Sequence, residues 1–254
     1  MTSPLMMDEL TWMEYEERVR QGAPVLIVAG STEQHGPHLP LGTDVIQGMA
    51  IARDVAERTG GIVAPPITYG YKSQPKSGGG QGFSGTTSLD AQTLVWLVRD
   101  LVREFVRHGV RRLIFIDGHY ENAMFLTEGI DLAMRDCEGV DAKILVFHWW
   151  DLISQQTVDA IFDGEFPGWA LEHAAVMETS VTGAVRPDLV HWDRLVDDRA
   201  ERLPPYDIYP PPPDIVPQSG VLSPARRASA AHGRRVVEEV VQAIVDLMRV
   251  EFRP

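Results

Sequence analysis

Residues 25–44 read VLIVAGSTEQHGPHLPLGTD, a strand-like run followed directly by polar residues. Its first five residues form an apolar, β-branched run closed by Gly30, which is typical of a strand buried on both faces. Polar residues follow at once, Glu33 and His35 among them, so they leave the carboxyl end of a buried strand. Functional sites of open α/β sheets gather at such ends.

Strand-like runs alternate with helix-like segments along the rest of the chain, without an internal repeat or a linker. This alternation predicts a mostly parallel central sheet covered by helices on both faces, an α/β fold built as a three-layer α/β/α sandwich. We expect residues 1–254 to form one domain. The further strands are expected at 62–64, 113–116 and 143–147, and helices at 45–59, 122–135 and 170–185.

Two more helices carry the strongest amphipathic patterns. In the first, Ser88 is the expected cap and Gly109 the expected end. The second is expected over roughly 225–251, with Ser223 as its cap and Pro224 in its first turn. The apolar stripe of the first consists of Leu94, Leu97, Val98, Leu101, Val102 and Phe105.

The acidic composition excludes several classes of partner. The 254 residues contain 36 Asp and Glu against 23 Lys and Arg, which gives a formal charge of −13. A binder of nucleic acid or of anionic membranes needs basic patches to neutralise phosphate, so neither activity is expected. With 44% hydrophobic and 23% charged residues, the chain has the composition of a folded globular protein.

One cysteine and the lack of a long apolar run narrow the setting further. Cys137 alone permits neither a disulfide framework nor a zinc site of the CxxC type. The N-terminal residues carry acids rather than a basic region, so no signal peptide is expected. No stretch reaches the ~18–20 apolar residues that a membrane helix needs. We therefore expect a soluble, cytoplasmic protein.

Two strand ends carry the residues that bear chemistry. The turn after the first strand contains Glu33 and His35, with Asp44 a little beyond, and a later strand is followed by His119 and Glu121. In each turn an acid and a histidine are two positions apart, so in extended backbone they point to the same side. One such pair arises easily by chance, whereas two pairs, each directly after a buried strand, indicate a common site.

The donor types indicate the kind of site. Imidazole and carboxylate ligands without thiolates are typical of a catalytic zinc or manganese centre rather than a structural one. The two pairs and Asp44 together supply five donors. That number is too large for one open tetrahedral site and suits two metals with a bridging carboxylate.

Other catalytic arrangements fit the sequence less well. No G-x-S-x-G nucleophile elbow is present, and Cys137 lies in a polar helix end without an obvious base. The glycine-rich residues 78–82 lack the Lys-Ser/Thr pair of a phosphate loop. They are equally consistent with a loop that covers a substrate and with a plain surface loop.

Tryptophans near the strand ends suggest a flat ligand. Trp149 and Trp150 end a predicted strand, and Trp169 shortly precedes His173. Stacking and cation–π contact would hold a planar ligand there, although each tryptophan is equally well explained as a core or interface residue. His173 and Glu178 are five positions apart, about 140° on a helix, so spacing does not place both in one site.

Half of the positions from Pro204 to Pro217 are proline. The simplest interpretation is an irregular surface segment before the last helix. A polyproline ligand for an SH3-like domain is the alternative.

Five motifs together resemble the creatininase (creatinine amidohydrolase) family, and the resemblance extends over essentially the whole chain. The first and fourth motifs mark the wider family, which includes formamide and peptide hydrolases, whereas the second and fifth are closer to creatininase proper. The motifs are GSTEQHGPHLPLGTD at 30–44, YGYKSQPKSGGG at 69–80, GTTSLD at 85–90, GHYEN at 118–122 and GWALEHAAVMETS at 168–180.

The resemblance implies a creatininase-like fold with a binuclear centre of zinc, manganese or both. It implies that Glu33, Asp44 and His119 hold one metal. It also implies that His35, Asp44 and Glu178 hold the other, with Asp44 bridging. Glu178 enters the ligand set through the resemblance alone.

The resemblance also implies roles for the remaining site residues. Glu121 changes from a ligand to the group that holds a water and passes protons, and His173 is a second candidate for proton transfer. The family assembles as a homohexamer. The residues that match its substrate-contacting positions are Ser77, Tyr120, Trp150, Trp169 and His173.

The activity implied is reversible hydrolysis of the lactam ring of creatinine, a small molecule, to creatine. Ala170 departs from the family, because creatininase proper has an acid after the tryptophan of the fifth motif. If that acid contacts the guanidino part of the ligand, creatinine binds less tightly here or the substrate differs. A relative acting on another cyclic or formyl amide is therefore the alternative. A metal cluster that only binds or stabilises an oligomer is the alternative outside enzymes.

Overall fold

The structure is a computed structural model that describes residues 5–74, 80–200, 205–212 and 214–253. In this part of the chain four strands form one sheet in the order β2-β1-β3-β4, and every neighbouring pair is parallel. The strands are β1 (Val25–Ala29), β2 (Ile62–Val63), β3 (Arg112–Asp117) and β4 (Lys143–His148).

The register of the sheet brings three strand ends together. Ala29 of β1 pairs with Asp117 of β3, and Asp117 pairs with His148 of β4. Because the strands are parallel, the turns that follow them leave the same edge of the sheet. The Glu33–His35 and His119–Glu121 pairs therefore leave neighbouring points of one edge.

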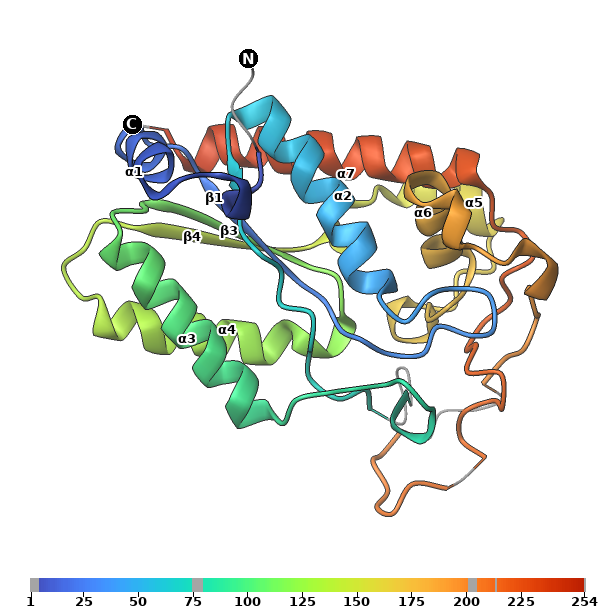
Figure 1. Cartoon of the computed structure of the whole chain (residues 1–254). Helices are drawn as coiled ribbons and strands as arrows, with labels where there is room; N and C mark the ends of the chain where they lie inside the picture. The colour runs from blue at the N-terminus through green and yellow to red at the C-terminus, as the bar shows by residue number, and fades with distance from the viewer. Residues whose placement is uncertain (1–4, 75–79, 201–204, 213, 254) are drawn as a thin grey trace.

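Helices cover both faces of this sheet. Figure 1 shows α3 and α4 on one side and α2, α6 and α7 on the other, which confirms the three-layer α/β/α sandwich. The helices are α1 (Trp12–Arg20), α2 (Thr43–Thr59), α3 (Ala91–Arg107), α4 (Ala123–Asp136), α5 (Gln155–Phe162), α6 (Val176–Val185) and α7 (Ala230–Glu251). Short 3-10 turns lie at Met7–Glu9, Gly80–Gly82, Tyr120–Asn122, Trp149–Leu152, Trp169–Leu171, Pro187–Leu189 and Trp192–Arg194.

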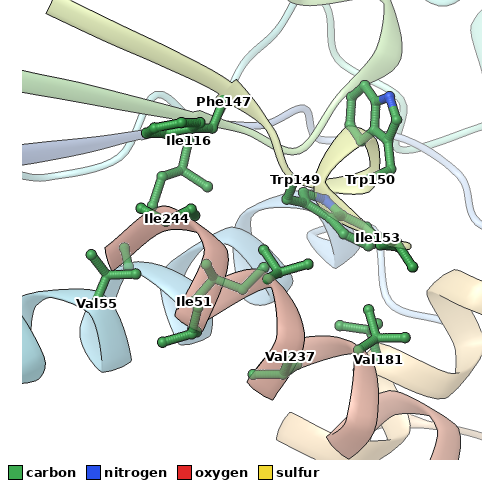
Figure 2. Packing of buried hydrophobic residues seen from close by; sticks show 14 of the residues in the cluster. Ile51, Val55, Ile116, Phe147, Trp149, Trp150, Ile153, Val181, Val237 and Ile244 are labelled. Carbon is green, nitrogen blue, oxygen red and sulfur yellow. The ribbon is translucent and has the colours of Figure 1, made fainter. Parts of the chain in front are cut away.

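Strand β1 is buried on both faces, as its apolar run predicts. Leu26 and Val28 pack into the cluster beneath α2 and α7, whereas Val25 and Ile27 belong to the cluster beneath α3 and α4. Figure 2 shows the first cluster, in which side chains of α2, α6 and α7 meet those of β3 and β4. Helices on both faces thus hold the sheet whose edge carries the polar turns.

Two predicted helix starts are wrong. Helix α3 begins at Ala91 with Asp90 at its N-cap position, and Ser88 instead accepts a hydrogen bond from Gln81. Helix α7 begins at Ala230, and Ser229 caps it by accepting the N–H of His232 at 3.2 Å.

The residues before α7 stay irregular because their backbone groups form hydrogen bonds with another segment of the chain. Ala225 N–H donates to Val196 O at 3.3 Å, and Ala200 N–H donates to Leu222 O at 3.0 Å. These bonds tie the segment to the chain near residue 200 before the helix can begin. The patterns of Ser223 and Pro224 fit a helix start, but tertiary pairing overrides them.

The helix predicted over 170–185 is also corrected. Its first part is a 3-10 turn, and α6 begins only at Val176, because Ala174 has a positive φ of 53° that an α-helix does not contain. Helix α5, capped by the Ser154 side chain, was not predicted. None of the helices in the described residues is long and apolar enough to cross a membrane.

Candidate metal centre and active site

Three turns at the carboxyl edge of the sheet place buried donors around Asp44. Asp44 lies in the first turn of α2, and its Oδ1 is 3.0 Å from His35 Nε2, while its Oδ2 is 3.2 Å from His119 Nδ1. His119 Nδ1 is also 3.3 Å from Glu33 Oε1. All four residues are at most 2% exposed. The two oxygens of one carboxylate thus face two different imidazoles, as in a bridging ligand.

Glycines and a backbone bond fix this arrangement locally. Ser31 N–H donates to Asp44 Oδ2 at 3.0 Å. A Cβ on Gly118 would lie 2.7 Å from Asp44 O, and one on Gly30 would lie 2.9 Å from Asp44 Cβ. Only residues without a side chain allow the two strand ends to approach the start of α2 this closely.

The segment around the start of α6 adds Glu178 and His173. Glu178 Oε1 lies 3.7 Å from His35 Nε2, and its Oε2 accepts the N–H of Ala174 at 2.5 Å. His173 Nδ1 lies 3.6 Å from Glu33 Oε1. The helix break at Ala174 explains how residues 140° apart on an ideal helix face one site.

Contacts to α2 and to the turn after β1 hold α6 in place. Gln47 Nε2 donates to Glu178 O at 2.9 Å, and His38 Nε2 lies 2.9 Å from Thr179 Oγ1. The buried carboxylate of Glu172 accepts the N–H of Met177 at 2.6 Å and that of Glu178 at 3.4 Å. Burial and the nearby Glu178 raise the pKa of Glu172 to about 8. Glu172 therefore caps α6 within the described structure.

Glu121 lies at the rim of the cluster rather than inside a ligand group. Its Oε2 is 3.4 Å from His119 Nε2, and its Oε1 accepts the N–H of Gln74 at 3.0 Å. By sequence spacing Glu121 is one of the five donors, whereas in the structure Glu178 belongs to a ligand group and Glu121 lies beside it.

Among the described residues, three groups of donors have ligand atoms within 4.8 Å of one another. Two of them equal the two ligand sets that the family resemblance implies, and both contain Asp44. The third group lacks Asp44 and combines Glu33 and His35, one from each of the other groups, with His173. The groups are Glu33–Asp44–His119, His35–Asp44–Glu178 and Glu33–His35–His173.

The buried donor set fits divalent metals. His35 Nε2 makes no aligned hydrogen bond, although it lies between carboxylate oxygens of Asp44, Glu178 and Glu33 at 3.0, 3.7 and 4.0 Å. A buried nitrogen without a hydrogen-bond partner needs an explanation. A metal ion that accepts this lone pair and the surrounding carboxylate oxygens supplies one.

The electrostatics of the cluster lead to the same conclusion. Burial acts to raise the pKa of Glu33 and of Asp44, but the neighbouring imidazoles outweigh it and hold both pKa values below their usual range. Burial acts to lower the pKa of His35 and His119, but the carboxylates outweigh it and raise both. The buried carboxylates are therefore stabilised by positive charge at this position, and a divalent cation provides such charge.

Aromatic side chains enclose a small cavity beside Glu178. The cavity measures about 30 Å³ and is lined by Tyr120, Trp150 and Trp169 together with Trp149, Gly118 and the two acids of the α6 start. The ring centroids of Tyr120 and Trp150 are 6.0 Å apart. Three of the five predicted substrate contacts thus share one cavity. His173 is not among the residues that line this cavity, and Ser77 lies outside the described residues.

Several residues of the site had no place in the sequence analysis. Ser73 is 3% exposed and donates a hydrogen bond to Glu33 Oε2. Asp117, fully buried at the end of β3, accepts from His148 Nδ1 at 2.9 Å, and His148 stacks on Trp150. Strand-end position could have indicated Asp117 and His148. Ser73 lies within the second motif, but no sequence spacing relates it to Glu33.

A second, larger cavity of about 790 Å³ is lined in part by Ser73 and Gln74. Its wall includes Tyr209 and other described residues between Pro204 and Pro217. Tyr209 Oη donates to Gln74 Oε1 at 3.2 Å. The described part of the proline-rich segment thus contacts Gln74 and has an irregular conformation, and the polyproline-ligand alternative stays untested.

Comparison with known proteins gives one family. The profile of the creatininase family, described as creatinine amidohydrolase, matches residues 8–248. The creatinine amidohydrolase of Pseudomonas putida is 47% identical over 100% of both chains. The chain belongs to the creatininase family.

Solved creatininases have the same fold. A mutant creatininase in complex with creatine superposes with a TM-score of 0.96 at 44% identity, over 99% of this chain and 100% of that one. A mutant creatininase of Zn-Zn type and a manganese creatininase each give 0.95, at 45% and 46% identity, over at least 99% of both chains.

Proposed function

We propose that this member of the creatininase family is a two-metal amidohydrolase that opens the lactam ring of creatinine to give creatine, reversibly. The observation that carries the proposal is the buried cluster in which two donor groups share Asp44 beside an aromatic cavity. Similarity to the creatinine amidohydrolase of Pseudomonas putida, at 47% identity over the full length, supports the substrate.

Zinc, manganese or both would occupy the cluster, as the names of the similar solved creatininases suggest. Glu33, Asp44 and His119 would hold one ion, and His35, Asp44 and Glu178 the other. Bound there, the ions lower the pKa of a water and polarise a carbonyl group.

The residues around the cluster supply proton transfer. Hydrolysis adds water to the ring carbonyl carbon, breaks the bond between that carbon and the ring nitrogen, and leaves one proton to be delivered to that nitrogen. Glu121, with Oε1 fixed by the Gln74 N–H and Oε2 near His119, is placed to hold this proton. His173 is the second candidate, since its Nδ1 faces the cluster and burial lowers its pKa, which favours the neutral, proton-accepting form.

The aromatic cavity would orient the planar substrate. Trp150, Trp169 and Tyr120 converge on the space beside Glu178. The cavity is small, at about 30 Å³, and movement of one of these aromatic side chains would widen it for the substrate. Stacking on these rings then holds the ring carbonyl toward the donor groups.

The alternative substrate is another cyclic or formyl amide, and Ala170 is the residue that favours it. It lies in the 3-10 turn that begins with Trp169, next to the aromatic cavity. An uncharged side chain there offers no partner to a guanidino group. A panel of creatinine and formamidopyrimidines, assayed with added manganese, tests the two substrate classes. Creatine release supports the proposal, and turnover confined to the other amides contradicts it.

We also propose a single domain over residues 1–254 and a cytoplasmic location. Assembly as a homohexamer is a further proposal, and it is the one that the family resemblance implies. Both core clusters pack on the same sheet, which supports one domain. Large apolar side chains, including Trp12 at 73% and Met124 at 75% exposed, offer surface for subunit contacts. Light scattering on protein eluted from a size-exclusion column measures the molar mass of the assembly, and the mass of a monomer would contradict the hexamer.

A further inference from the structure

The segment Tyr71–Gln74 contacts three residues of the active site. Tyr71 O lies 2.8 Å from His119 Nε2, the Ser73 hydroxyl donates to Glu33 Oε2, and Gln74 N–H donates to Glu121 Oε1 at 3.0 Å. The segment thus meets the turn after β1 once and the turn after β3 twice.

The contact of Ser73 divides the two oxygens of Glu33 between different tasks. Oε2 accepts from Ser73, while Oε1 is the oxygen that faces the imidazoles of His119 at 3.3 Å, His173 at 3.6 Å and His35 at 4.0 Å. A carboxylate whose second oxygen is held by a hydrogen bond presents the first oxygen in one orientation.

Packing leaves this pair little freedom. Ser73 is 3% and Glu33 is 2% exposed. A Cβ built on Gly80 would lie 3.1 Å from Glu33 Oε2 and 3.2 Å from Ser73 Oγ. The hydroxyl and the carboxylate oxygen are therefore enclosed on the side of Gly80, so the hydrogen bond between them is retained rather than exchanged with bulk water.

We propose that Ser73 is a positioning residue that fixes Glu33 as a ligand with one oxygen and so sets the metal affinity of the Glu33–Asp44–His119 group. The proposal rests on the proposed function, because it requires a metal there. In the described structure the hydroxyl of Ser73 bonds to Glu33 and not to Glu178 or His35, so the His35–Asp44–Glu178 group should depend on it far less.

The test is a titration of metal-depleted protein with Zn²⁺ in competition with a chromophoric chelator, for the wild type and Ser73→Ala. Loss of a hydrogen bond to a ligating carboxylate typically lowers metal affinity 10- to 100-fold. We expect a decrease of about that size for one of the two bound ions and less than about threefold for the other. Ser84→Ala, at an exposed serine of the same loop, is the matched control and should keep both affinities.

A general structural defect would weaken both ions together, so equal weakening, or no weakening, overturns the proposal. Gly80→Ala tests the same pair from its other side if Ser73→Ala does not fold, because its methyl group would press on Glu33 Oε2. It should weaken the same single ion. If the wild-type chain binds no metal, the proposed function itself is contradicted. If the wild type binds two ions and Ser73→Ala binds both with the same affinities, only the role of Ser73 is contradicted.

Discussion

The site has two halves that are built differently. Glu33, His35 and His119 follow strands β1 and β3, whose pairing places their turns side by side. Glu178 and His173 lie around the start of α6, a segment that pairs with no strand in the described residues. The first half takes its position from sheet register, and the second depends on a backbone break at Ala174 and on the cap from Glu172.

The difference shows which parts of a site can be predicted from the sequence and which depend on the folded backbone. Register is set by short apolar runs that are visible in the sequence, so donors after those runs are expected at one edge. The positive φ of Ala174 accompanies a local hydrogen bond, from Ala174 N–H to Glu178 Oε2, that an uninterrupted helix would not contain. A predicted helix over this region points His173 and Glu178 in different directions, whereas the folded segment turns both toward Glu33 and His35.

Asp44 joins the halves, so its loss should have the largest effect. Asp44→Asn keeps an acceptor for the Ser31 N–H but removes the charge that both donor groups share. We expect both ions to bind weakly and creatine release to fall by roughly 10³-fold or more, since metal activation contributes several kcal/mol. Inductively coupled plasma analysis and an activity assay measure this. Asp54→Asn on the same helix is the control, and full metal content in Asp44→Asn would contradict the shared role.

Glu121→Gln tests proton transfer in the half of the site that follows β1 and β3. The amide keeps the size of the side chain but cannot take up a proton, so turnover should fall by ~10² or more with metal content unchanged. Steady-state kinetics and metal analysis check this, with Glu128→Gln on the exposed side of α4 as the control. Wild-type turnover in Glu121→Gln would remove this residue from the proton path.

Glu172→Ala tests the helix-borne half. Loss of the acceptor for Met177 N–H and Glu178 N–H should lower the free energy of unfolding by about 1–2 kcal/mol. Urea unfolding at fixed metal concentration measures it. Glu172→Gln keeps an oxygen acceptor and should lose less. If the two variants behave alike, the cap is not what holds the start of α6.

Ala170→Asp has the smallest expected effect and concerns substrate choice. An acid next to the aromatic cavity would offer a charged partner to a guanidino group, which should lower KM for creatinine about tenfold, or about 1.4 kcal/mol. Ala170→Asn separates charge from side-chain volume. An unchanged KM in both variants would mean that this position does not contact the substrate.

The sequence predicts the sheet and the strand-end donors better than the remainder. The alternation of apolar runs with helical stripes carries the sandwich, and two Glu/His pairs carry the edge that holds the site. It does not predict α5 or the start of α7, because the bond from Ala225 N–H to Val196 O competes with helix formation. It also gives no sign of Ser73, because its contact with Glu33 exists only after the chain folds back over the edge of the sheet.

Creatinine hydrolysis should require two metals, held jointly by the donors that follow strands and by Glu178 of α6. Titration of the metal-depleted chain with Zn²⁺ or Mn²⁺, with creatine release from creatinine recorded at each step, tests it most directly. We predict that creatine release appears and levels off at about two ions per chain. A plateau at one ion, or a filled site without creatine release, would contradict the account.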